Sequence, residues 1–181
     1  MKMPIVTVPN KVLTTKARPV RDFGPKLAKL VDDMIETLES CIDPVGVGLA
    51  APQVGVGQRL FVIKPTPKSK PQVFINPEII SIDPSVKIDD EKLTNDENSE
   101  ALEGCLSIPR IWSPVTRPHK VTVTWQDVKG NHHQKDLIGF DAVIIQHEVD
   151  HLDGVLFTRR AAEQKSPVYE ERGKKLYEMK I

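Results

Sequence analysis

Apolar residues between Pro25 and Leu38 recur at the three- and four-residue spacing of one face of an α-helix. They are Leu27, Leu30, Val31, Met34, Ile35 and Leu38. The residues between them are mainly charged or polar, so the pattern predicts an amphipathic helix with one buried side. Asp22 lies just upstream, where its carboxylate can cap the free N–H groups of the first turn.

Three further segments favour β-strands. The runs Arg59–Lys64 and Gln72–Ile82 are rich in β-favouring residues, and Val121–Trp125 alternates apolar residues with threonine, as in a half-buried strand. Residues 127–131 contain Lys-Gly-Asn, which suits a hairpin turn. The second arm of that hairpin begins with the pair His132 and His133.

A second helix is predicted over 139–154, where almost no position looks suited to solvent. Ala142, Ile145, Val149 and Leu152 share one side, and apolar residues also occupy other positions around the helix. Short strands interleaved with few helices indicate an α+β fold, with antiparallel sheets packed around this buried helix. The length of 181 residues fits one domain spanning 1–181.

Two polar segments carry weaker patterns. Residues 83–100 are acidic with little that can pack, which indicates a surface insertion. Residues 163–181 have a sparse helical pattern through Val168, Leu176 and Met179, so a surface helix is expected there.

Charge and composition narrow the class of function. Lysine plus arginine and aspartate plus glutamate both total 25, so the net charge is zero and direct nucleic-acid specificity is not expected. No apolar run is long enough to span a bilayer, and the first residues lack the apolar core of a secretory signal. The chain has only two cysteines, Cys41 and Cys105, so a disulfide scaffold is not expected. A location in the reducing cytoplasm is expected instead.

The predicted buried helix contains His-Glu-x-x-His at His147, Glu148 and His151. Histidines four residues apart lie on one face of a helix, so both can bind one metal ion, and the intervening glutamate can act as a base on water. Two buried histidines that merely satisfy hydrogen bonds are the alternative. Asp150 and Asp153 either hold the outer imidazole nitrogens or are simply solvated.

A catalytic metal site of this kind needs a third protein ligand. Glu163, Glu170 and Glu171 follow the helix but look like surface residues in a polar tail. Cys105 is the better candidate, because a thiolate is a strong ligand and Gly104 permits close approach of the backbone. A small buried hydrophobe or a nucleophile activated by histidine are the alternatives for this cysteine.

Three ordered motifs together resemble the peptide deformylases: Gly46-Val-Gly-Leu-Ala-Ala-Pro-Gln53, Glu103-Gly-Cys-Leu-Ser107 and Gln146-His-Glu-Val-Asp-His151. The resemblance implies a metal-dependent hydrolase that removes the formyl group from the N-terminal methionine of new proteins. It implies the metal ligands Cys105, His147 and His151, with Glu148 as acid/base. The implied oxyanion donors are the Gln53 side-chain amide and the Leu106 backbone N–H.

The same resemblance implies how a peptide is bound. Val47 and Gly48 would pair with the substrate as an added strand, with Gly104 also in the substrate site. Phe140, Val143 and Ile144 precede His147 on the predicted helix and are expected to wall a pocket for the methionine side chain. Arg117 is expected to pair with Glu103. The sequence departs from the family at Trp112, where an arginine is often found.

The resemblance also implies one divalent metal ion, Fe²⁺ in the cell, with Zn²⁺ or Ni²⁺ as possible ions in purified protein. The expected partners are N-formylmethionyl peptides and nascent chains, with transient ribosome contact and no membrane. An endopeptidase using the same helix and a catalytically silent metal protein are the rival functions. Cys105 as ligand argues against the first, and Glu148 with Gln53 against the second.

Overall fold

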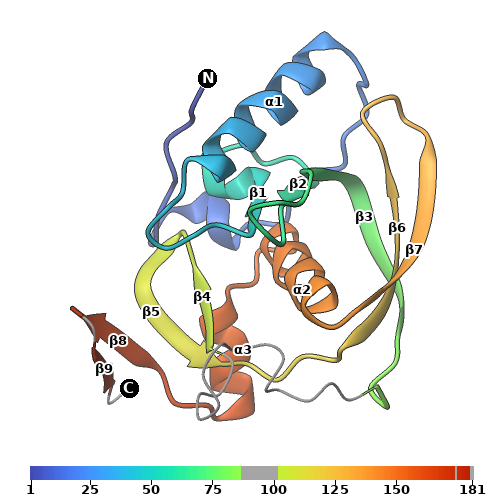
Figure 1. Ribbon diagram of the computed structural model, residues 1–181. Helices are drawn as coiled ribbons and strands as arrows, with labels where there is room; N and C mark the ends of the chain where they lie inside the picture. Colours follow the sequence, from blue (N-terminus) through green and yellow to red (C-terminus); the bar gives the residue numbers. More distant parts are fainter. Residues whose placement is uncertain (87–101, 174, 180–181) are drawn as a thin grey trace.

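The computed structural model describes residues 1–86, 102–173 and 175–179 (Figure 1). It is a mixed α and β structure with antiparallel sheets, as the sequence predicts. The α-helices of the described residues are α1 (Pro25–Glu39), α2 (Phe140–Leu152) and α3 (Phe157–Gln164). The strands are β1 (Gly48–Ala50), β2 (Leu60–Ile63), β3 (Gln72–Ile82), β4 (Leu102–Cys105), β5 (Ile108–Pro114), β6 (Lys120–Gln126), β7 (His132–Ile138), β8 (Tyr169–Arg172) and β9 (Lys175–Glu178).

The larger sheet has five antiparallel strands in the order β1-β2-β3-β6-β7. All four residues of β2 are buried, whereas β6 alternates between buried Val121 and Val123 and half-buried neighbours. Asp127 closes the β6–β7 turn by accepting backbone hydrogen bonds from Lys129 and Asn131. The predicted strands and the hairpin are therefore confirmed.

Helix α1 packs on this sheet through its apolar side. Leu27, Val31, Met34 and Leu38 are buried in one cluster with Leu60 and other sheet residues. The predicted helix is confirmed, but the predicted cap is wrong. Gly24 occupies the N-cap position without a side-chain hydrogen bond, and Pro25 opens the first turn. Proline has no N–H and a helical φ, so it begins this helix without a carboxylate cap.

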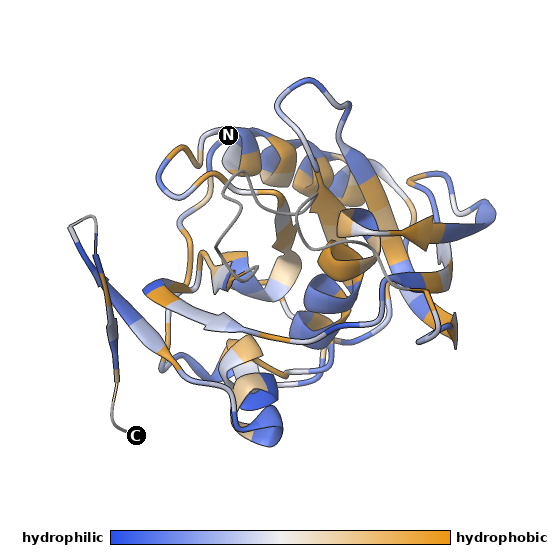
Figure 2. Cartoon of the chain, turned by 60° about the horizontal axis from the view of Figure 1, so that its bottom comes forward, coloured by the Kyte–Doolittle hydropathy of each residue, from blue (hydrophilic) through white to orange (hydrophobic). Residues whose placement is uncertain are grey.

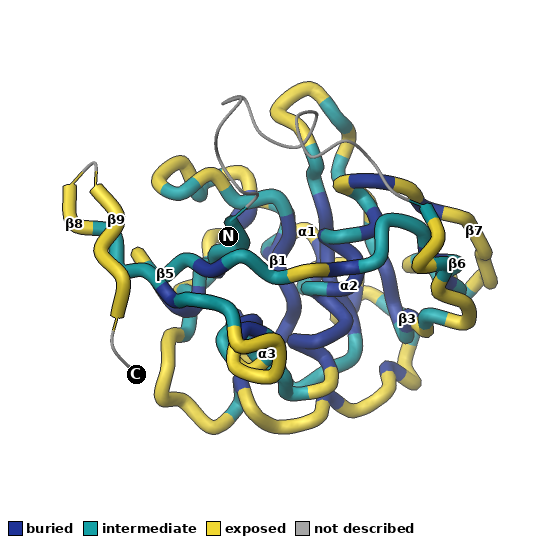
Figure 3. The backbone as a smooth tube through the Cα atoms, turned by 90° about the horizontal axis from the view of Figure 1, so that it is seen from below, coloured by how far each residue is buried: buried dark blue, intermediate teal, exposed yellow. Residues whose placement is uncertain are grey.

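Helix α2 lies close to β1 and β7 of the same sheet. Ala142, Ile145 and Leu152 are fully buried in a second cluster with Phe61 and Val121. Figure 3 shows β1 and much of α2 in the buried colour, whereas β7 is mostly exposed. This packing fixes the direction in which the remaining side chains of α2 project.

The smaller sheet has four strands in the order β4-β5-β8-β9. Its last two strands form a hairpin that extends away from the rest of the molecule, with mostly hydrophilic residues (Figure 2). The surface helix predicted over 163–181 is therefore wrong. Helix α3 ends at Gln164, and the following residues pair with β5 instead, since Ile111 is opposite Glu170 and Trp112 opposite Tyr169.

Residues 87–100 of the predicted polar insertion lie outside the described residues. Only its first residues are described, and there Asp83 accepts hydrogen bonds from the backbone and hydroxyl of Ser85. In the part of the chain that is described, no helix combines the length and the apolar character needed to traverse a bilayer.

Candidate metal centre and cleft

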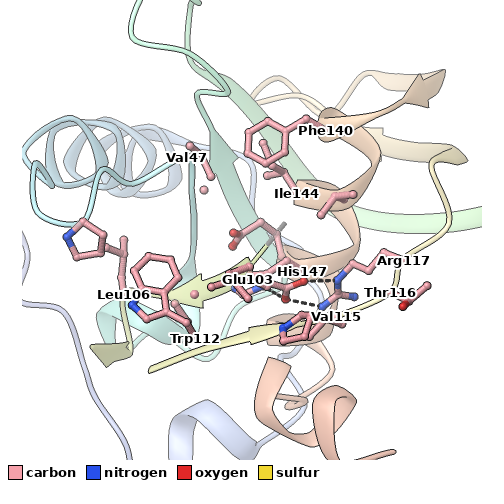
Figure 4. A pocket seen from close by; sticks show the side chains of 18 of the residues that line it. Val47, Glu103, Leu106, Trp112, Val115, Thr116, Arg117, Phe140, Ile144 and His147 are labelled. Atoms are coloured by element: carbon pink, nitrogen blue, oxygen red, sulfur yellow. Dashed lines mark hydrogen bonds and ion pairs between the residues drawn. The ribbon is translucent and has the colours of Figure 1, made fainter. Parts of the chain in front are cut away.

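A cleft of about 750 Å³ opens between α2, β1 and the β4–β5 pair (Figure 4). Residues from both sheets and from α2 line it. The lining includes Val47, Gly48, Gln53, Glu103, Gly104, Cys105, Leu106, Trp112, Arg117, Phe140, Val143, Ile144, His147 and Glu148. The three sequence motifs, which are far apart along the chain, therefore meet in one place.

Cys105, His147 and His151 form a compact group beside this cleft. One possible ligand atom from each lies within 4.8 Å of the others. Cys105 ends β4, and both histidines project from the same side of α2, one turn apart. Cys105 Sγ lies 3.2 Å from His151 Nε2. This group is the one set of three or more such side chains in the described residues that could hold a metal ion.

The electrostatics of this group favour a thiolate. Burial alone would raise the pKa of Cys105, but His151 and His147 outweigh that effect and lower it to about 5. Burial also disfavours charge on His147, yet Glu103 and Cys105 raise its pKa well above the usual value. A buried thiolate with two imidazoles is a donor set that suits zinc and other first-row divalent ions, so these residues fit a metal ion.

Glu103 contacts the ring nitrogen of His147 that is not available to the ligand group. Its Oε1 lies 2.5 Å from His147 Nδ1, which leaves Nε2 of that ring for the ligand group. Arg117 donates two hydrogen bonds to Glu103, at 2.7 and 2.8 Å, as the family resemblance implies. Burial opposes ionisation of Glu103, but Arg117 and His147 lower its pKa to about 2. The contact between Glu103 and His147 was not predicted.

Asp150 in α2 and Asp153, the residue that caps the C-terminal end of α2, have different partners from those considered. Asp150 is buried and pairs with Arg117 at 2.9 Å and with Arg160 at 2.6 Å. Asp153 pairs with Arg59 at 2.7 Å. Asp150 is thus neither bonded to a ligand imidazole nor solvated, because a buried carboxylate requires cationic partners and finds two arginines.

Glu148 is buried beside the ligand group, with 3% of its surface exposed. Burial raises the pKa of this carboxyl to about 7. Its Oε2 has no hydrogen-bond partner within the described residues. Gly48 lies directly against the same carboxylate, since a Cβ there would be 2.2 Å from Oε1. Strand β1 therefore needs glycine at this position for Glu148 to occupy its place.

Gln53 borders the group from the side of the larger sheet. It lies in a short 3-10 helix, Ala51–Val54, and is 1% exposed. Its Oε1 accepts a hydrogen bond from the Ala50 N–H at 2.8 Å, which turns Nε2 toward Cys105 Sγ at 3.5 Å. Leu106, directly after Cys105, also lines the cleft.

The other expected substrate residues also border the cleft. Gly48 begins β1 and Val47 directly precedes it, whereas Phe140, Val143 and Ile144 lie along α2. Phe140 is 41% exposed at the mouth, whereas Ile144 is 3% exposed and also belongs to the core.

The glutamates considered as third ligands are bound elsewhere. Glu163 pairs with Arg159 and Arg160 on α3, and Glu170 with Arg172 on β8. Glu171 accepts a hydrogen bond from the Trp112 indole at 2.9 Å. This last contact was missed because the tail was expected to be helical.

Comparison with known proteins agrees with this arrangement. A family model described as polypeptide deformylase matches residues 2–167. The peptide deformylase of Erythrobacter litoralis is 41% identical, and the match covers 84% of this chain and 86% of the relative.

Solved structures are similar as well. The peptide deformylase from Thermotoga maritima has a TM-score of 0.75 at 38% identity, covering 88% of this chain and 97% of that one. A peptide deformylase from Synechococcus elongatus, in complex with actinonin, has a TM-score of 0.74 at 34% identity, with 87% and 78% covered. The chain belongs to the polypeptide deformylase family of metal-dependent hydrolases.

Proposed function

We propose that this chain removes the formyl group from N-formylmethionyl peptides and nascent chains. One observation carries the proposal. A single cleft brings together the Cys105, His147 and His151 group, the buried carboxylate of Glu148 and the amide of Gln53. A metal site that served only to stabilise a fold would need neither Glu148 nor Gln53.

Cys105, His147 and His151 would hold one divalent ion, with Glu103 orienting the His147 ring. When bound, the ion supplies Lewis acidity and activates water at neutral pH. We assign Fe²⁺ to the protein in the cell and regard Zn²⁺ and Ni²⁺ as ions that can replace it, because thiolate and imidazole bind all three.

Glu148 is assigned the proton transfers. Its Oε2 takes a proton from the attacking water as the new C–O bond forms at the formyl carbon. The same oxygen then delivers that proton to the peptide nitrogen as the C–N bond breaks, which releases formate and a free amine. Its buried position without a neighbouring donor leaves this atom available for both steps.

Gln53 and Leu106 are assigned the role of stabilising the negative charge that develops on the formyl oxygen. The Gln53 Nε2 amide, 3.5 Å from Cys105 Sγ, and the backbone N–H of Leu106, the residue after Cys105, are neutral donors. Each preorganised donor of this kind contributes about 3 kcal/mol of barrier lowering in comparable sites. The bond from Ala50 to Gln53 Oε1 fixes the amide orientation that this role requires.

The substrate is proposed to lie as an extended strand beside Val47 and Gly48. Gly104, which also lines the cleft, is assigned to the same substrate site. Phe140, Val143 and Ile144 would wall the pocket for the methionine side chain, since they lie within one to two turns before His147 on α2.

In this proposal residues 1–181 form one catalytic domain, with α2 as the central buried helix that carries the His-Glu-x-x-His motif between the two sheets. The protein would act in the cytoplasm on nascent chains, with transient contact to the ribosome. Its cleft is specific for a peptide terminus and not for nucleic acid.

The decisive assay measures formate release from a formyl-methionyl peptide by the metal-loaded protein, with casein cleavage measured in parallel. We expect formate release and no casein cleavage. Glu148→Gln should keep its metal while turnover falls at least about a hundredfold, the low end for general acid/base catalysis. Casein cleavage would favour an endopeptidase, and a parent inactive on both substrates would refute the proposed activity.

A further inference from the structure

The indole of Trp112 covers one end of the cleft. Trp112 lies in β5 directly opposite Gly104 of β4 and Tyr169 of β8. Its ring lies close against Gly104, because a Cβ on that glycine would be 2.5 Å from the ring carbon Cζ3. The indole therefore occupies the space that a side chain at 104 would otherwise fill.

Glu171 fixes this indole from the C-terminal hairpin. Trp112 is opposite Tyr169, so the two side chains share one face of the sheet. Glu171 is two residues after Tyr169 and therefore lies on that same face, diagonally across from Trp112. Its Oε2 accepts the indole N–H at 2.9 Å. Its Oε1 lies 3.8 Å from Arg110 Nη1, and Arg110 Nη2 lies 4.0 Å from Asp43.

This contact joins a residue inside the segment that the family model matches to a residue outside that segment. Trp112 belongs to the segment matched by the family model, whereas Glu171 lies beyond residue 167, where that match ends. Figure 4 shows Trp112 beside Leu106, on the other side of His147 and Glu103 from Phe140 and Ile144. The cleft thus has two apolar walls with the ligand group between them.

We propose that Glu171 is a positioning residue that holds Trp112 as an apolar wall for the second residue of the substrate. The inference rests on the proposed deformylase function. In an extended peptide, successive side chains point to opposite sides. If the methionine points to Phe140 and Ile144, the next side chain points to Trp112 and Leu106. The cleft then favours an apolar second residue.

Peptide selectivity tests this directly in the metal-loaded enzyme. We compare formyl-Met-Leu and formyl-Met-Gly peptides with the parent and with Glu171→Ala. The parent should prefer leucine, and the variant should lose about tenfold of that preference through KM, with kcat little changed, as expected for a lost apolar contact. Glu170→Ala is the matched control, because Glu170 points to the opposite face and pairs with Arg172.

Two further variants separate positioning from general damage. Glu171→Gln retains an oxygen that can accept the indole N–H, so it should restore the preference for leucine. Trp112→Phe keeps an apolar ring but lacks the N–H, so adding Glu171→Ala to it should change nothing further.

Three results would overturn the inference: equal selectivity in the parent and Glu171→Ala, loss in Glu171→Gln as complete as in the alanine variant, or additive effects in the double variant. A parent that releases no formate from either peptide would instead refute the proposed function itself.

Discussion

Replacing Gly48 with alanine should disable Glu148 without unfolding the protein. The added Cβ would lie 2.2 Å from Glu148 Oε1, whereas ordinary contact begins near 3.4 Å, so the carboxylate must move by about 1.2 Å. The displaced group is the end of a flexible side chain, so the cost in folding free energy is small. A misplacement of about 1 Å at a catalytic group costs on the order of a hundredfold in rate, or about 2.7 kcal/mol.

Formate release under saturating peptide measures this effect, with metal content and thermal unfolding followed on the same preparations. We expect kcat to fall about a hundredfold while metal content and unfolding temperature stay near the parent's. Gly57→Ala is the control, since a Cβ there meets nothing within 4 Å. Full activity in Gly48→Ala, with the metal retained, would show that Glu148 does not act from the position it occupies here.

Three further predictions concern the metal. Cys105→Ser should lose metal affinity, because an alcohol is a far poorer ligand than a thiolate, whereas Cys41→Ser should bind metal normally; equal metal content in both would exclude Cys105 as a ligand. Glu103→Gln should weaken metal binding by at least about tenfold in a competition titration with a chelator, since it removes the carboxylate that orients His147, and unchanged affinity would contradict that role. Peroxide should inactivate the ferrous enzyme, with oxygen added to the peptide containing Cys105, while a zinc form persists; an iron form that keeps full activity would refute the iron assignment or the thiolate ligand.

The sequence predicted those helices and strands that are marked by the spacing of apolar residues within a short segment. Helix α1 and the strands β2, β3 and β6 follow from spacings within a few residues. The same logic failed at the C-terminus, where Val168, Leu176 and Met179 mimic a sparse helical pattern. Those residues instead belong to a hairpin region whose pairing partner, β5, lies more than fifty residues earlier in the chain.

In the site, too, the sequence predicted the contacts between near neighbours in the chain and missed those between distant residues. The two histidines of α2 are neighbours because of helical geometry, so their proximity can be read from the sequence. Glu103 and His147 are 44 residues apart, and their contact depends on how β4 is placed against α2. The partners of Asp150 had the same non-local origin. Residue types alone could not assign them, because several arginines were available to any buried carboxylate.

The ligand group joins parts of the fold that otherwise belong to separate layers. Cys105 comes from the smaller sheet, while both histidines come from a helix that packs on the larger one. A bound ion would therefore act as a crosslink between the two layers. Since an ion that binds only the folded chain adds its binding free energy to that of unfolding, about 4 kcal/mol at a thousandfold excess over Kd, resistance to unfolding becomes a function of metal supply.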